Sequence, residues 1–350
     1  MKTPVRADMG VSRTKCHQSA ADFNLRIQVP ACTAGGGRVE RGRATPMKTT
    51  ITAADLHASV IAVPPLCRDA GLKADAVENA KLIRHIEAGG VSTLLYGGNA
   101  NFYNIALSEY AAVLDQLAAA AAPETWIVPS VGPYFGTMMD QAAILAPRKF
   151  PTAMVLPTIA VSSPEGVRVA VMKFVERAGI PAVLYVKDEK YVTVEVVKSL
   201  VQAGVISWIK YAVVRANPAV DPLLRAIVDS VDPALVVSGI GEQPASTHWR
   251  DFGIRAFTSG CVCVAPRRSQ EMLAALRTGD FARAEAIRER FHSLESLRNA
   301  HGPIPVLHHA VELAGIAATG PALPLMTDLG ELLRDEIFPA ATGLLGWNEG

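Results

Sequence analysis

The sequence predicts an α/β protein, a (β/α)8 TIM barrel with an additional C-terminal helical segment. Three observations support this fold class. From about residue 57, short apolar runs alternate with amphipathic stretches. The runs are almost continuously apolar, as parallel strands covered on both faces are. Eight such units in roughly 220 residues fit a closed barrel. A doubly wound open sheet built from the same units is the alternative.

Eight apolar runs are the predicted strands, and each is short enough to cross a barrel once. They lie at residues 58–63, 92–97, 126–131, 153–157, 182–186, 206–211, 234–239 and 255–259. Cys261 and Cys263 follow the last run, and their spacing predicts that both thiols share one strand face, as buried structural cysteines.

Helices are predicted between the strands, for example at 75–88, 164–178 and 193–203. Each of these three ends in Ala-Gly, and glycine readily adopts the left-handed conformation that follows a helix. After residue 265 the pattern is helical throughout, at 267–278, 280–299, 303–317 and 329–338. We therefore expect a barrel over residues 47–270 and a helical segment packed on it over residues 271–350.

Residues 1–46 contain eight Lys/Arg against three Asp/Glu and a run of three glycines, so we expect a disordered tail. The whole chain of 350 residues has a formal charge of +1 and few aromatic residues, which argues against nucleic-acid binding. No apolar run is long enough for a membrane span. Five cysteines without a CxxC motif are typical of a reduced, cytoplasmic protein.

Lys210 lies inside the predicted strand at 206–211, and Tyr185 lies near the end of the strand at 182–186. Burial lowers the pKa of a lysine, and a neutral amine can attack a carbonyl to form a Schiff base. A phenol on the neighbouring strand could exchange protons with the reacting group. The alternative is that Lys210 extends from the strand end to water.

Other informative residues also lie at strand ends, where TIM-barrel active sites are built. They are Gly97-Gly98-Asn99, Gly239 and Thr258. Adjacent glycines expose backbone N–H groups that can bind a carboxylate, although a simple tight turn has the same sequence. His301, His308 and His309 form the densest histidine group, but their spacing favours surface or packing roles, so no metal site is predicted.

From about residue 57 to residue 345, these features together resemble the dihydrodipicolinate synthase / N-acetylneuraminate lyase family of Schiff-base aldolases. The resemblance implies that Lys210 forms the Schiff base, that Tyr185 is the general acid and base, and that Gly97, Gly98 and Asn99 hold the keto-acid carboxylate. It implies a lyase that acts on pyruvate or a related 2-keto acid and needs no cofactor. Gly239 and Thr258 are expected to line the substrate site.

The sequence also departs from the family pattern. Gly98 and Asn99 replace the two threonines of the carboxylate-binding turn, and the segment 157–160 lacks the tyrosine of the family's proton relay. Lys190 stands near the position of an arginine that grips a second carboxylate. These differences argue against authentic dihydrodipicolinate synthase and favour a divergent aldolase, hydratase-aldolase or dehydratase. A keto-acid-binding sensor on the same barrel is the alternative without catalysis.

The resemblance further implies a homo-oligomer, either a dimer or a tetramer, and an aldehyde as a candidate second substrate. Asp188 and Glu189 beside Lys190, together with the apolar segment 159–161, predict a less anionic and more hydrophobic partner than the usual aldehydes of the family.

Overall fold

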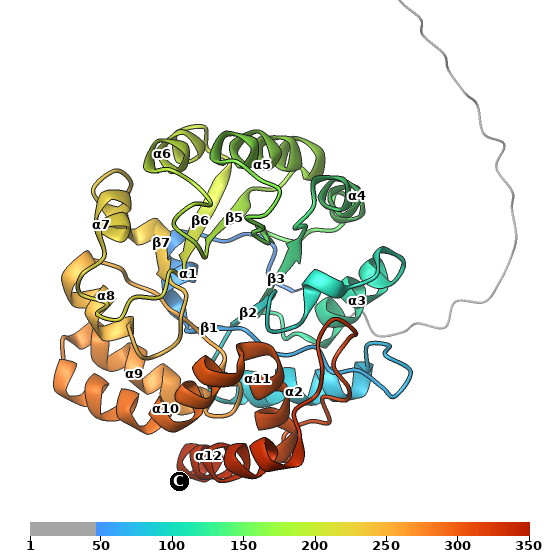
Figure 1. The fold of residues 1–350 in the computed structure, drawn as a ribbon, viewed down its shortest axis with the longest axis vertical. Helices are drawn as coiled ribbons and strands as arrows, with labels where there is room; N and C mark the ends of the chain where they lie inside the picture. The colour runs from blue at the N-terminus through green and yellow to red at the C-terminus, as the bar shows by residue number, and fades with distance from the viewer. Residues whose placement is uncertain (1–46) are drawn as a thin grey trace, which may run out of the picture. The chain divides into compact units, whose positions relative to one another are not determined.

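Eight parallel strands form the centre of the computed structural model, which describes residues 47–350 (Figure 1). The expectations for residues 1–46 therefore lie outside the described residues. The strands run β7-β6-β5-β4-β3-β2-β1-β8 around the sheet. A parallel bridge between Ser238 and Phe257 joins the two ends, with Ser238 N donating to Ala256 O at 3.0 Å. The closed barrel confirms the predicted fold class, and the open sheet is excluded.

Each strand lies within or at a predicted apolar run, and nearly all strand residues are buried. Burial on both faces explains why the runs are apolar throughout rather than alternating. The strands are β1 Ile61–Ala62, β2 Thr93–Tyr96, β3 Trp126–Val131, β4 Ala153–Val155, β5 Ala182–Val186, β6 Ile206–Tyr211, β7 Val236–Ser238 and β8 Thr258–Ser259.

A ring of helices surrounds the strands, one after each strand (Figure 1). The predicted starts are set by capping side chains: Asp75 accepts from the N–H groups of Val77 and Glu78, and Ser163 accepts from Gly166 N. Each such cap contributes about 1 kcal/mol. The ring comprises α2 Ala76–Ala88, α3 Leu107–Ala120, α4 Phe135–Leu145, α5 Pro164–Ala178, α6 Val194–Gln202, α7 Pro222–Val228, α8 Ala245–Phe252 and α9 Pro266–Thr278, and α1 Ala53–Ala58 precedes β1.

The C-terminal helices are α10 Phe281–His301, α11 Pro303–Leu313 and α12 Glu331–Glu349. Helix α12 is longer than predicted, because Pro339 lies inside it instead of ending it. Proline removes one hydrogen bond to the carbonyl four residues earlier. Here that carbonyl belongs to Asp335, and both residues are exposed, so water can replace the lost donor. Beyond the proline, the buried Ala341 and Leu344 hold the last turns of the helix in place.

Two local predictions were wrong. Gly89 has φ −83°, and it is Gly90, with φ +85°, that adopts the left-handed conformation after α2. The strand β8 ends at Ser259, so Cys261 and Cys263 lie in a 3-10 turn, η3 Cys261–Cys263, and not on a strand. Both thiols are buried and unbridged, as expected for structural cysteines.

Candidate active site

Lys210 and Tyr185 lie side by side at the carboxyl ends of β6 and β5. They are paired residues in the parallel register of the two strands. The Lys210 Nζ atom is 4.6 Å from the centre of the Tyr185 ring. Lys210 is 6 % exposed and Tyr185 is 8 % exposed, so the amine does not extend to the surface as a solvated lysine would. The strand register therefore brings an amine and a phenol together in a nearly dry site.

Burial and neighbouring charge both act on the amine. Burial, together with the positive charges of Lys187 and Arg298, lowers the pKa of Lys210 to about 7. At pH 7, about half of the protein molecules therefore carry Lys210 in its neutral form. Burial raises the pKa of Tyr185 to about 12, with a small opposing effect of Arg298, so the phenol keeps its proton. Such a pair can supply a nucleophile and a proton donor at the same pH.

A cavity of about 350 Å³ opens above this pair. Gly239 at the end of β7 lies against the Lys210 stem: a Cβ atom there would be 2.9 Å from Lys210 Cγ and 2.7 Å from Tyr211 O. No other residue would leave this space free. The cavity is lined by Val63, Gly98, Asn99, Tyr103, Tyr185, Lys187, Lys210, Ala212, Val214, Gly239, Ile240, Gly241, Thr258, Gly260, Arg298, Asn299, Pro303 and Ile304.

The turn after β2 presents free backbone donors at the cavity. Asn101 N donates to Gly98 O at 2.9 Å and Phe102 N donates to Gly97 O at 3.1 Å, which closes the turn. The N–H groups of Gly98 and Asn99 have no acceptor among the described residues. The Asn99 side chain donates to Val63 O at 3.1 Å and so faces the barrel backbone. Such a turn can bind a carboxylate through its main chain.

Helix α11 holds this turn from outside. His308 Nε2 contacts Asn99 O at 3.0 Å, and burial lowers the pKa of His308 to about 4. The imidazole is therefore neutral, with its proton on Nε2 to donate to the carbonyl. His309 instead accepts from Leu329 N and contacts Glu312. Both histidines pack within the fold, as the sequence spacing suggested.

Not all the predicted site residues reach the cavity. Lys210, Tyr185, Gly98, Asn99, Gly239 and Thr258 line it together, whereas Gly97 and Lys190 do not. A Cβ atom on Gly97 would be 2.5 Å from Met154 Cε, so this glycine lies against the barrel wall. Lys190 is exposed, and its place at the cavity is taken by Lys187.

Three residues with ionisable side chains line the cavity but were not predicted from the sequence. Lys187 directly follows β5, Tyr103 follows the turn after β2, and Arg298 comes from α10. Lys187 could have been identified as a candidate site residue, because it directly follows the carboxyl end of a predicted strand. Arg298 sits in a helix rich in charged residues and has no sequence signal that separates it from solvated arginines.

Two buried carboxyl groups lie behind Gly241, next to Arg298. Glu242 accepts hydrogen bonds from the hydroxyls of Ser259, at 2.8 Å, and Ser269. Glu295 Oε1 accepts from Glu242 N at 2.9 Å, and its Oε2 has no partner. Burial raises the pKa of both carboxyl groups, and the neighbouring Glu242 raises that of Glu295 further. The neighbouring Glu242 therefore favours the neutral form of Glu295.

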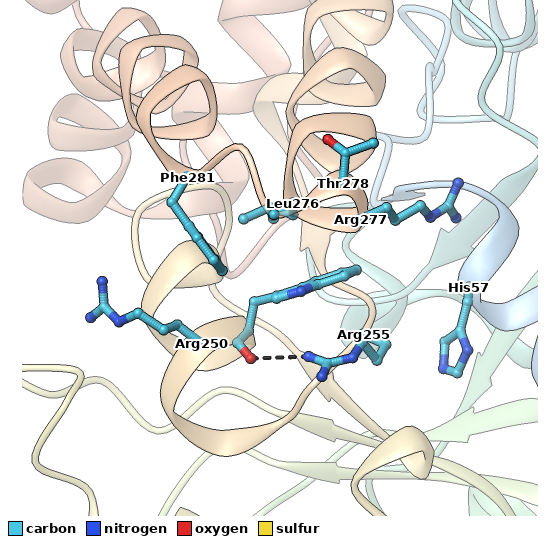
Figure 2. Close-up of a pocket in the computed structure, with 9 residues that line it drawn as sticks. His57, Arg250, Arg255, Leu276, Arg277, Thr278 and Phe281 are labelled. Atoms are coloured by element: carbon cyan, nitrogen blue, oxygen red, sulfur yellow. Dashed lines mark hydrogen bonds between the residues drawn. The ribbon is translucent and has the colours of Figure 1, made fainter.

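A second depression lies at the amino-terminal ends of the strands, and Figure 2 draws the residues that line it. Figure 2 shows His57 and Arg277 on one side of it and Arg250 on the other. Arg255 donates to Trp249 O at 3.0 Å and stacks on the Trp249 ring. This depression is lined by no lysine and no tyrosine, so it lacks the pairing of an amine with a phenol that Lys210 and Tyr185 form.

Residues 47–350 contain no group of three or more His, Cys, Asp or Glu side chains arranged to hold a metal ion. In the same part of the chain, no helix combines the length and apolar composition that a membrane span requires.

Comparison with solved structures places this barrel among dihydrodipicolinate synthases. The synthase from Bacillus clausii superimposes with a TM-score of 0.73 at 21% identity, covering 85% of this chain and 99% of that one. The synthase from Oceanobacillus iheyensis gives 0.74 at 19% identity, covering 85% and 98%. At these identities the likeness shows the fold.

YagE, a prophage protein of the dihydrodipicolinic acid synthase family from E. coli K12 solved in complex with pyruvate, gives a TM-score of 0.72 at 19% identity, covering 82% of this chain and 98% of that one. No curated protein matches the sequence. The model of the dihydrodipicolinate synthetase family matches residues 58–337, and the chain therefore belongs to this family.

Proposed function

We propose that this protein is a Schiff-base-forming lyase that makes or cleaves a carbon–carbon bond next to the keto group of pyruvate or a related 2-keto acid. The observation that supports it best is the nearly dry pair of Lys210 and Tyr185 at the base of an open cavity. A buried lysine is costly to the fold, and its lowered pKa makes it a nucleophile near pH 7.

The proposed chemistry conserves protons between the two side chains. The neutral Lys210 amine attacks the keto carbon, and its proton moves to the former carbonyl oxygen to give a carbinolamine. Tyr185 donates its proton to the departing hydroxyl, water leaves, and a protonated imine remains beside a phenolate. The phenolate then takes a proton from the neighbouring carbon to form the enamine, which restores the phenol. The enamine is the carbon nucleophile that adds to an aldehyde, and cleavage is the reverse.

The turn after β2 would orient the keto acid in this scheme. Gly98 and Asn99 line the cavity, their N–H groups have no acceptor among the described residues, and the keto-acid carboxylate would accept from both. Main-chain donors need no threonine hydroxyl, so the turn could hold a substrate despite its altered sequence. Thr258, the first residue of β8, also lines the cavity.

We do not assign dihydrodipicolinate synthesis to this chain. Thr158 and Ala160, at the place of the family's second relay tyrosine, line a separate surface depression and not the cavity. Lys190, at the position of the family's arginine, is exposed. Tyr103 does line the cavity, and its pKa is raised by burial and by the nearby phenols of Tyr185 and Tyr191. The proton route beyond Tyr185 would therefore differ from that of the synthases.

Borohydride trapping tests the proposed nucleophile. The protein is incubated with pyruvate, reduced, and mapped by peptide mass spectrometry. We expect a single reduced adduct on Lys210. An adduct on Lys187 or Lys190 would refute the site, and the absence of an adduct with pyruvate and with a panel of 2-keto acids would refute the proposed function.

Hydrogen exchange separates an enzyme from a keto-acid-binding sensor, since a sensor can form an imine without moving protons. In deuterated water, enamine formation replaces the methyl hydrogens of pyruvate with deuterium, which NMR detects without knowledge of the second substrate. We expect exchange by the native protein and a loss of about a hundredfold or more in Tyr185→Phe. An adduct on Lys210 without exchange would favour the sensor.

We also propose that the protein is a homo-oligomer. Support comes from apolar side chains exposed around the depression between α4 and α5: Tyr134 at 60 %, Phe135 at 53 % and Val161 at 70 %. Apolar patches of this kind mark interaction surfaces. Sedimentation would show a dimer or tetramer, and Val161→Asp should shift it toward smaller species.

A further inference from the structure

We propose that the cavity selects a 2-keto acid that carries a second carboxylate, and that Arg298 of α10 binds this distal group. The proposal rests on the proposed function, because it places the keto group at Lys210. It adds the substrate class, a 2-keto dicarboxylate, and a specificity residue that lies outside the barrel strands.

The charge of the cavity is the first argument. Lys187, Lys210 and Arg298 line it, and none of its lining residues is Asp or Glu. Neither Lys187 nor Arg298 forms an ion pair within residues 47–350, and Glu189, two residues after Lys187, pairs with Arg215 instead. Basic groups that form no ion pair, at the wall of a concave site with no acidic lining residue, favour an anionic ligand.

The free donors of Arg298 are the second argument. A guanidinium has five N–H donors. Arg298 Nη2 donates to Ile240 O at 2.6 Å and to Asn299 Oδ1 at 2.8 Å, and Nε donates to Asn299 Oδ1 at 3.2 Å. Nη1 has no acceptor among the described residues, which leaves two donors for a ligand. The side chain is 8 % exposed and fixed by these contacts, so binding would cost little conformational entropy.

The nearby carboxyl groups do not already occupy Nη1. Glu242 accepts from the hydroxyls of Ser259 and Ser269, Glu295 Oε1 accepts from Glu242 N, and neither carboxyl group forms an ion pair with Arg298 within residues 47–350. Arg298 lowers the pKa of both carboxyl groups, so negative charge on either one stabilises the buried guanidinium. Lys187, at the exposed rim, would add attraction for the incoming anion.

The sequence suggested a less anionic partner, because Asp188 and Glu189 follow β5. Neither lines the cavity. Asp188 Oδ1 accepts from Lys190 N at 2.8 Å, and Glu189 pairs with Arg215. The apolar residues Ala160 and Val161 belong to the depression between α4 and α5. The features that favoured a hydrophobic partner thus lie away from Lys210.

Two keto acids of equal length test the proposal. 2-Oxoglutarate and 2-oxopentanoate differ in that a methyl group replaces the distal carboxylate. The concentration giving half-maximal borohydride-trapped adduct on Lys210 is measured for both, with pyruvate as reference. Because Arg298 would form a charge-assisted pair of hydrogen bonds with the distal carboxylate, the half-saturating concentration should be at least about tenfold lower for 2-oxoglutarate than for 2-oxopentanoate. Equal or tighter binding of 2-oxopentanoate would overturn the proposal while the pyruvate adduct leaves the proposed function standing.

Variants on one helix identify the residue responsible. Arg298→Gln should reduce the ratio between the two keto acids to about threefold or less, and Arg298→Lys should retain part of it. Arg290→Gln, on the exposed side of α10, should keep the native ratio. If Arg298→Gln weakens both keto acids by the same factor, Arg298 has only a structural role. If no keto acid forms an adduct in the native protein, the inference falls together with the proposed function.

Discussion

Two basic regions lie at opposite ends of the barrel, and they differ in what surrounds their charges. Above the carboxyl ends of the strands, Lys210 is buried and Arg298 has free donors. At the amino ends, Arg255 donates hydrogen bonds to backbone carbonyls (Figure 2). Arg250 is paired with Asp251. Burial lowers the pKa of Lys210, whereas Arg255 is exposed to solvent.

The difference shows that a count of basic residues does not locate a site. Both regions hold several cations, and both are hollowed. What separates them is desolvation: a lysine in a dry strand end becomes a nucleophile, while exposed arginines remain solvated cations. Each of the following predictions tests that distinction.

The largest expected effect comes from exchanging side chains between the two regions. Lys210→Arg keeps the charge but removes the nucleophile, so adduct formation with pyruvate should fall by at least about a thousandfold. Arg255→Lys places a lysine in the opposite depression, where only about one exposed lysine in 2,500 is neutral at pH 7. Peptide mapping after borohydride should find no adduct at residue 255. An adduct there would mean that desolvation does not select Lys210.

Removing the buried amine should stabilise the fold. The pKa of Lys210 is about 7 in the folded state against 10.5 as the ordinary value, so the folded state binds fewer protons than the unfolded state. The resulting cost is complete below pH 7, shrinks between pH 7 and 10.5, and vanishes above. Lys210→Met should therefore raise the free energy of unfolding by up to about 4 kcal/mol at pH 7.

Chemical denaturation at pH 7 and pH 10 measures this difference. Arg255→Met, in the exposed region, should change stability by less than about 0.5 kcal/mol at either pH. The gain in free energy of unfolding of Lys210→Met over the native protein should be larger at pH 7 than at pH 10. Equal gains at the two pH values would show that the amine is not desolvated.

The rate of adduct formation should follow the titration of the same amine. Only the neutral form attacks, so the initial rate should rise about tenfold between pH 6 and pH 8 and then level off. Arg298→Gln removes a positive charge that lowers the pKa of Lys210, so its profile should move to higher pH. A native rate that keeps rising to pH 10 would indicate an ordinary, solvated lysine.

The sequence predicted the barrel well because every strand is buried on both faces, which leaves a continuous apolar run for each. It predicted Lys210 and Tyr185 because polar groups inside such runs stand out. It did not predict Arg298, which reaches the cavity only because α10 packs near the end of β7, a long-range contact with no local pattern. It misplaced Lys190, because the loop after β5 turns Lys187 toward the cavity instead.

The smallest effect should come from two histidines that make the same contact at opposite ends. His308 Nε2 lies 3.0 Å from Asn99 O, and His57 Nε2 lies 2.9 Å from Ala234 O. Because His308 positions the turn that presents Gly98 and Asn99 N–H, His308→Ala should raise the pyruvate concentration for half-maximal adduct by about three- to tenfold. His308→Gln keeps a donor and should recover most of the loss.

His57→Ala is the matched control, since it removes a similar hydrogen bond far from Lys210. The pyruvate concentration for half-maximal adduct should stay within about twofold of the native value, while the free energy of unfolding should fall by about 1 kcal/mol. The pKa of His308 near 4 keeps its imidazole neutral, so the effect of His308→Ala should be the same at pH 6 and pH 8. If both alanine variants weaken pyruvate binding equally, the turn does not depend on its contact with α11, and the two ends of the barrel are coupled through stability alone.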